Sequence, residues 1–317
     1  MSTLAETRHL VQKQARQNRQ PFEVLLGAIL ATVVFAAVYL ALVFRLRHDN
    51  AAIAWLIGPG LCGLLCIGLA LVAVIFYHRQ RPVRAIVVFA LAVLTGLVAG
   101  VYVGQQNWNR YMMMWYNYQD MGSYVNVDPG VDVGQSFMDA GHIYFKDGSY
   151  VLQRKGLAFH NGATYCVAPI VRQPVQMMPG QSNPFVLATA TGFAVPLSGT
   201  IDFWAVGVDC CGTTGTDAPF TCGDAQSHIA RSGARLLNNA ERENYLLAVK
   251  EWSASAGLPV RHPQFFKWVK DPIKDMQTYY HNAWSEFWLY LFMVFICALI
   301  LCFVLMFLLQ KVGFWAR

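Results

Sequence analysis

Four cysteines in the less apolar part of the chain are the residues best suited to covalent chemistry. They are Cys166, Cys210, Cys211 and Cys222. Four cysteines allow three pairings. The pairing that joins Cys210 to its neighbour Cys211 is strained, because adjacent Cα atoms lie only about 3.8 Å apart. We therefore predict two disulfides, which join Cys166 to one of the neighbours and Cys222 to the other.

The same cysteines could instead bind a metal ion. Cys210, Cys211 and Cys222, together with His228 or Asp224, would supply ligands of the kind that zinc accepts. However, the chain has no CxxC pair. The topology argued below also places this region in an oxidising compartment, where thiols form disulfides. The sequence therefore favours disulfides over a metal site.

No motif in the chain indicates catalysis. GxSxG, HExxH and GxxxxGK(S/T) are all missing. Residues 58–63 fit GxGxxG, but that fingerprint needs a strand before it and a soluble helix after it, and here it lies in an apolar run. A scattered set such as His160, Asp202 and Asp209 is conceivable, although Asp is commoner in turns and caps. We therefore predict no catalytic residue, no cofactor and no metal.

Four long apolar runs flank the segment that holds these cysteines and must position it. The chain is 56% hydrophobic and 13% charged, whereas a soluble domain is about one-quarter charged. The runs 24–44, 52–77, 85–104 and 287–310 contain no Asp, Glu, Lys or Arg. A helix of about 20 such residues crosses a bilayer. We predict four transmembrane helices, three before a large domain and one after it.

Positive charge beside these runs predicts their orientation, because Lys and Arg gather on the cytoplasmic side. The flanks assigned to that side hold Arg8, Lys13, Arg16, Arg19, Arg79, Arg81, Arg84, Lys311 and Arg317. Only Arg45 and Arg47, in the first loop, oppose this assignment. The N-terminal segment 1–23 and the tail 311–317 are therefore predicted to be cytoplasmic, in the plasma membrane or an endomembrane.

The distribution of charge excludes one class of partner. The net charge of the chain is +6. Residues 105–286, however, hold 13 Lys and Arg against 15 Asp and Glu. The excess of positive charge thus lies beside the apolar runs and not on the domain. We expect the lipid bilayer, and not nucleic acid, to be a partner.

A stripe of small residues marks the third apolar run. Ala92, Gly96, Gly100 and Gly104 recur at four-residue steps. Small side chains at this spacing let another helix approach closely. The partner helix could be the second run, or the same stripe in a second copy of the chain. The stripe therefore predicts helix packing and allows a homo-oligomer through transmembrane helix three.

Residues 105–286 change to short β-like runs separated by turn residues. The candidate strands are 142–146, 149–154, 158–160, 164–171, 185–190 and 200–208. Turns at Lys146–Gly148 and His160–Gly162 are typical of hairpins, and a mainly antiparallel sheet follows. Trp204 is predicted to be a core residue, because both faces of its strand are apolar.

After Cys222 the pattern becomes helical. Apolar residues recur at helix spacing in 245–252, and a second helix is expected to start near Pro272 and to run into the fourth apolar run. The predicted fold class is therefore a membrane protein with four transmembrane α-helices and an inserted β-rich α+β domain. This domain, 105–286, is expected on the non-cytoplasmic side.

Four segments of the domain carry a family resemblance. They are Thr164–Ile170, Asp202–Cys211, Cys222–Asp224 and His262–Pro272. These segments resemble a large family of uncharacterised multi-pass membrane proteins of dinoflagellate protists. The resemblance covers the domain, about half of the chain, and implies a shared module without implying an activity.

Three classes of function follow from these observations. The first is a membrane-anchored binding or structural protein, whose domain presents a surface to a protein or glycan on the non-cytoplasmic side. The alternative is a channel or transport-complex subunit, although the four apolar runs carry no Asp, Glu, Lys or Arg of the kind such proteins use. The third is a membrane-bound enzyme, which needs a pocket with clustered histidines and carboxylates.

Overall fold

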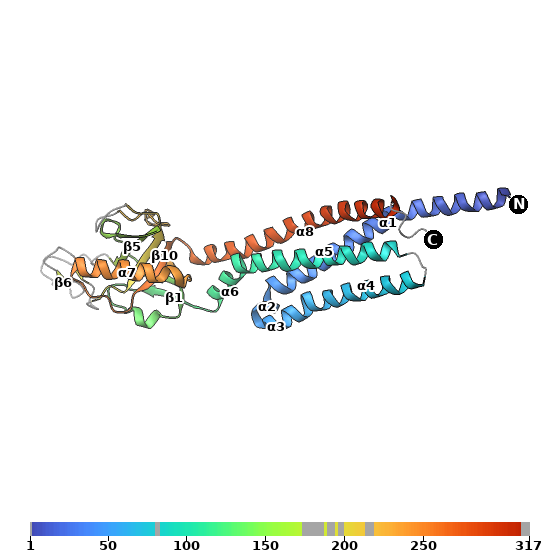
Figure 1. Ribbon diagram of the computed structural model, residues 1–317. Coiled ribbons are helices and arrows are strands. Elements are labelled where there is room, and N and C mark those ends of the chain that lie inside the picture. Colours follow the sequence, from blue (N-terminus) through green and yellow to red (C-terminus); the bar gives the residue numbers. More distant parts are fainter. Residues whose placement is uncertain are drawn as a thin grey trace. The chain divides into compact units, whose positions relative to one another are not determined.

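The computed structural model describes residues 2–79, 83–172, 187–188, 194–195, 200–212 and 219–311. The chain divides into two compact units. The first, here called the helical unit, comprises the chain up to Met114 and from Tyr279 onward. The second, here called the β domain, is Trp115–Thr278. Figure 1 shows the long helices of the one and the sheet of the other.

The helical unit holds the four apolar runs. Its elements are α1 (Ser2–Val43), α2 (Arg45–Asp49), α3 (Ala51–Trp55), the π-helical turn η1 (Leu56–Gly60), α4 (Leu61–His78), α5 (Arg84–Asn107), the π-helical turn η2 (Trp108–Met112), the start of α6 (Met113–Gln119) and most of α8 (Pro272–Lys311). The segments Gln20–Val43, Ala51–His78, Arg84–Gln119 and Pro272–Leu309 are long and apolar enough to cross a membrane. The predicted apolar helices are therefore present.

The β domain contains a mixed sheet and one long helix of its own. Its elements are β1 (Gly122–Val127), the 3₁₀ turn η3 (Gly134–Phe137), β2 (Ala140–Phe145), β3 (Ser149–Val151), the 3₁₀ turn η4 (Gln153–Lys155), β4 (Leu157–Asn161), β5 (Ala163–Arg172), β6 (Leu187–Ala188), β7 (Ala194–Val195), β8 (Phe203–Val208), β9 (Ser232–Arg235), α7 (Asn239–Ala256) and β10 (Gln264–Val269). The strand order is β1-β2-β9-β10-β8-β5-β3, and β4 also pairs with β5. Within this sheet β1–β2 and β8–β10 are parallel and the other pairs are antiparallel.

Most of the strands that precede Cys222 follow the prediction, but β1 and β7 were not predicted. The predicted runs correspond to β2, β4, β5 and β8, and β3 is shorter than expected because Gln153–Lys155 turns into η4. Of the predicted strand 185–190, Leu187–Ala188 form β6, and the rest lies outside the described residues. Gly162, with φ +74°, joins β4 to β5 as a hairpin. The second expected hairpin was wrong, because β2 pairs with β1 and β9 while β3 pairs with β5.

Two strands after Cys222, one before α7 and one after it, were not predicted, because the sequence indicated only helices in this part of the chain. The strand β9 lies between β2 and β10, and its Ser-Gly-Ala-Arg sequence has no β-branched residue. Its neighbours in the sheet, and not its own propensity, make it a strand. In β10 the alternation of Phe265, Lys267 and Val269 with Phe266 and Trp268 is a strand signal.

The sheet curls on itself. β2 and β3 stand near opposite ends of the strand order, yet only residues 146–148 separate them in the chain. The two ends must therefore approach each other. Asp128, just after β1, holds them together through ion pairs with Lys146 and with Arg172 at the end of β5.

An inner core fills the concave side of the curled sheet. It includes Phe145, Val151, Phe203, Phe266 and Trp268, which are all buried. These residues come from β2, β3, β8 and β10, so strands from both ends of the sheet share one apolar centre. The rings of Phe145 and Trp268 stack with centroids 5.7 Å apart. Burial of these large side chains is the main source of stability for the domain.

The helix α7 covers the other face of the sheet (Figure 1). Asn238 caps its start by accepting from the backbone N–H of Ala240, and Gly257 ends it in the left-handed conformation, φ 67°. Trp204 is fully buried against Trp252 of α7, with ring centroids 4.9 Å apart. The predictions of this helix and of Trp204 as a core residue are confirmed.

Candidate functional site

The small-residue stripe of α5 packs against α1. Ala92, Gly96, Gly100 and Gly104 are all buried. A Cβ atom on Gly96 would lie 2.3 Å from the backbone oxygen of Ala31, so only glycine allows this approach. The sequence pointed to the second apolar run or to a second copy of the chain as the partner, and the structure instead places α1 against Gly96, Gly100 and Gly104. The helix α4 contacts a different side of α5.

A polar cluster at one end of the helical unit was not expected. Glu286 of α8 accepts hydrogen bonds from Tyr111, 3.1 Å, and from Asn107, 3.2 Å. Arg110 lies 3.5 Å from the same carboxylate. The signal in the sequence was a single acid placed directly before an apolar run. These contacts tie α5 and η2 to α8.

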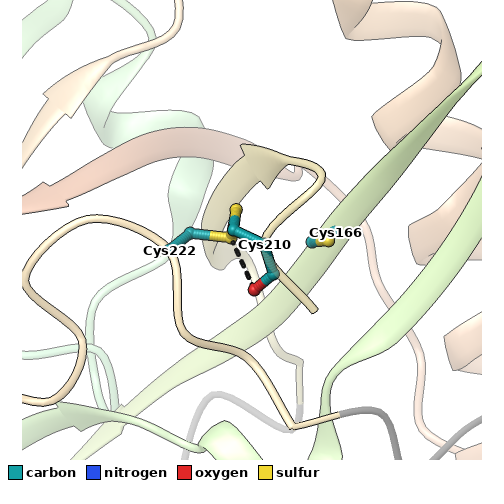
Figure 2. Close-up of side chains that lie close together, drawn as sticks. All are labelled: Cys166, Cys210 and Cys222. Atoms are coloured by element: carbon teal, nitrogen blue, oxygen red, sulfur yellow. Dashed lines mark hydrogen bonds between the residues drawn. A yellow bond between two sulfur atoms is a disulfide. The ribbon is translucent and has the colours of Figure 1, made fainter. Parts of the chain in front are cut away.

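The four domain cysteines form two disulfides. Cys166 bonds Cys211, with Cα atoms 5.8 Å apart, and Cys210 bonds Cys222, with Cα atoms 5.0 Å apart. Figure 2 shows Cys166 on its strand beside the Cys210–Cys222 bond. The sequence left two pairings open, and the structure selects this one. It joins the segment after β8 both to β5 and to the loop before β9.

A glycine makes room for the second disulfide. Gly207 of β8 stands opposite Cys166 of β5. A Cβ atom on Gly207 would lie 2.6 Å from the sulfurs of both Cys210 and Cys222. The disulfide therefore lies directly on the sheet surface at this position.

The three sulfurs of Cys166, Cys210 and Cys222 lie within 4.8 Å of one another. That spacing would suit a metal ion only if the sulfurs were thiolates, and here each belongs to a disulfide. Asp224, one of the further ligands considered, accepts the backbone N–H of Lys270 and pairs with its ammonium group. The cysteines therefore act as braces in this structure.

The structure does not assemble all three residues of the scattered set: His160 and Asp209 both contact Thr164, but Asp202 lies apart from them. The two aspartates flank opposite ends of β8. Asp202 is buried, and its carboxylate accepts backbone N–H groups of Gly134, Arg261 and His262. Asp209 instead accepts the backbone N–H of Thr164. Both carboxylates hold loops in place, as caps do.

A large cavity of the β domain lies beside β3. It has a volume of about 810 Å³ and is lined by 147–154, 225–231 and Trp268. We call it the β3 groove. An ion pair between Asp147 and Arg231 bounds one end, and a hydrogen bond from Gln153 to the carbonyl of Ala225 bounds the other. The volume falls within the range of ligand sites, roughly 300–1,000 Å³.

The backbone of β3 faces this groove with one edge unpaired by any described strand. β5 is the only described strand that pairs with β3. The backbone N–H of Leu152 donates to the carbonyl of Pro169. In an antiparallel pair every second residue bonds to the neighbouring strand, so Tyr150 and Leu152 are the residues whose backbone groups face β5. The N–H and C=O groups of Val151 therefore point away from β5 toward the groove. A free strand edge of this kind is a template for another strand.

Side chains in the groove offer both polar and apolar contacts. Ser149 is 7% exposed, and its hydroxyl has no hydrogen-bond partner among the described residues. Ile229 is 81% exposed at the opposite wall. Arg154 and His228 add hydrogen-bond donors.

Comparison with known proteins adds no further information on this groove. No family model, no curated protein and no solved structure matches the chain. Sequence reasoning missed the groove because its two walls, around Ser149 and around Ile229, are separated by some 80 residues. Only the register of β3 and the path of 225–231 bring them together.

Proposed function

We propose that this protein is a membrane-anchored binding protein whose β domain binds an extended polypeptide segment of a partner in the β3 groove. The observation that carries the proposal is the edge of β3, inside a cavity, with which no described strand pairs. Peptides that add a strand to such an edge gain backbone hydrogen bonds and fit alternate side chains into pockets. The helical unit would then serve as the anchor.

The proposed topology places the β domain on the non-cytoplasmic side and both termini in the cytoplasm. It is supported by the bias of Lys and Arg in the flanks of the apolar helices. The two disulfides agree with it, because disulfides persist in oxidising compartments. Membership of the dinoflagellate family is likewise a proposal, and it rests on the four segments quoted above.

The dimensions of the groove suit a short extended chain. Between its two bounding contacts the edge runs over residues 148–152. Five residues of strand span about 16 Å. A partner strand beside Val151 would lie between β3 and Ile229. We therefore expect a segment of four to five residues with one apolar side chain directed at Ile229.

Protease protection tests the topology. Trypsin added to intact cells is expected to cut within the β domain while a tag placed after Arg317 stays whole, because the tail is cytoplasmic. Permeabilised cells serve as the control, in which the tag must be lost. Loss of the tag in intact cells, with the β domain protected, would show that the orientation is reversed.

A peptide library tests the groove. We expect seven-residue peptides displayed on phage to be enriched by the full chain in nanodiscs. As free peptides they should bind Ile229→Asp at least tenfold more weakly, equivalent to about 1.4 kcal/mol, because a carboxylate replaces the apolar wall. Leu247→Asp is the matched control, since Leu247 is an exposed apolar residue of α7 that does not line the groove.

Two results would contradict the proposal. One is that no peptide is enriched over a nanodisc without protein. The other is that Ile229→Asp and Leu247→Asp weaken binding equally, which would place the peptide elsewhere on the surface.

A further inference from the structure

A buried histidine lies where α6 packs on the sheet of the β domain. His142 of β2 is 3% exposed, and the centroid of its ring lies 5.2 Å from that of Tyr118 in α6. Its Nδ1 atom lies 3.5 Å from the hydroxyl of Ser123 in β1. Its Nε2 atom is buried and has no hydrogen-bond partner among the described residues. The ring is therefore enclosed, and one of its two nitrogens is left without a polar contact in that part of the chain.

These surroundings suit the neutral form of the imidazole. In the sheet His142 stands opposite Ala234 of β9, which offers it no charge. A neutral imidazole carries one N–H donor, whereas an imidazolium carries a donor at each nitrogen. The charged form would thus bury a donor at Nε2 without an acceptor, in addition to burying the charge itself. Burial accordingly lowers the pKa of His142.

Charged side chains on this face of the sheet do not offset that cost. Residues 115–119 of α6 and the whole of β1 contain no Asp, Glu, Lys or Arg, and Asp120 is the first charged residue after α6. Lys267 of β10 stands on the far side of Ala234. The start of α8 adds Asp275, which interacts with Lys267, and Asp271, which accepts from Tyr144. None of these groups contributes to the lowered pKa of His142, for which burial is the cause.

Tyr118 couples this histidine to α6. The hydroxyl of Tyr118 donates to the carbonyl of Arg235 in β9 at 2.7 Å, which fastens the end of α6 to the sheet. The helix α6 carries the chain from the helical unit into the β domain. Because the ring of Tyr118 packs on that of His142, a charged imidazole that moves toward water has to displace Tyr118.

We propose that His142 is an acid-sensitive latch, which in its neutral form holds α6 on the sheet and on protonation releases α6 and the start of β1. The unfolded pKa of histidine is about 6.5, and the folded pKa of His142 lies below it. The latch therefore contributes its full stability above about pH 6.5 and loses it as the pH falls toward the folded pKa. It requires no ligand and does not depend on the β3 groove.

Amide hydrogen exchange of the full chain in nanodiscs tests the latch. Protection is compared at pH about 7.5 and about 5.5, after correction for the intrinsic pH dependence of exchange. We expect residues 116–125 to lose protection about tenfold at the lower pH, while β10 keeps its protection. In His142→Phe this loss should disappear, because an aromatic ring remains in place but cannot be protonated. His142→Gln, which is neutral at both pH values, should show the same constancy.

His160→Gln is the matched control, because it removes an exposed histidine of β4 in the same domain. It should lose protection at the lower pH as the unchanged chain does. The proposal is overturned if the unchanged chain keeps its protection at the lower pH, or if His142→Phe or His142→Gln loses as much as the unchanged chain. Equal loss of protection in β10 would also contradict it, since acid would then unfold the whole domain and not release α6.

Discussion

Replacement of Gly96 by leucine is expected to destabilise the helical unit by about 3 kcal/mol or more, the upper part of the range for overpacking. The reason is the short distance to α1, since even a Cβ atom would lie 2.3 Å from the backbone oxygen of Ala31. A backbone atom within a helix cannot turn aside as a side chain can. The two helices must therefore separate, with loss of the contacts that Ala92 and Gly100 also make. Unfolding of the full chain by increasing SDS in mixed micelles measures the change.

Gly63→Leu is the control for this prediction. Gly63 lies in α4, and a Cβ atom there would meet no atom within 4 Å. A leucine at that position should change stability by less than about 1 kcal/mol, as is usual for an exposed site. Equal effects of the two substitutions would mean that α5 does not approach α1 as described.

Loss of the Cys166–Cys211 disulfide is expected to destabilise the β domain by about 4 kcal/mol, because in the chain-entropy model the cost rises with the length of the closed loop. This disulfide spans 45 residues, whereas Cys210–Cys222 spans 12. Loss of the shorter Cys210–Cys222 link should cost about 3 kcal/mol. Together these values approach the whole stability of a small domain, about 5–15 kcal/mol. The double-alanine variants of each pair, unfolded in urea and followed by tryptophan fluorescence, give the two values.

Single variants check the pairing itself. With Cys211→Ala, Cys166 should react with a thiol reagent after denaturation without reductant, in addition to the four free cysteines of the apolar helices, and peptide mapping identifies it. With Cys210→Ala, Cys222 should react instead. Reaction of Cys222 in Cys211→Ala would show that the alternative pairing forms in solution.

The sequence was most informative where a pattern is local. Three local features were predicted, because each depends on neighbouring residues. They are the uncharged apolar runs, the helix α7 with its end at Gly257, and the turn at Gly162. The pairing of β9 was not predictable, because Ser232–Arg235 form a strand through contacts with β2 and β10. The partner of Gly96 was not predictable either, since a small-residue stripe specifies close approach but not which helix approaches.

The candidate sites depend on contacts between distant segments, and sequence reasoning could not find them. The cysteines were identified as disulfide candidates, but the choice between two pairings needed the positions of β5 and β8. The walls of the β3 groove likewise come from 147–154 and 225–231, which are far apart in the chain.

Hydrogen exchange at the amide of Val151 tests the proposed function most directly. This N–H points into the β3 groove, whereas the N–H of Ser149 is bound to Lys146 and that of Tyr150 faces β5. A library-selected peptide that adds a strand is expected to slow exchange at Val151 strongly and to change its two neighbours much less. If the same bound peptide leaves Val151 unchanged and slows amides elsewhere in the β domain, the β3 edge is not the binding site and the proposed function is wrong.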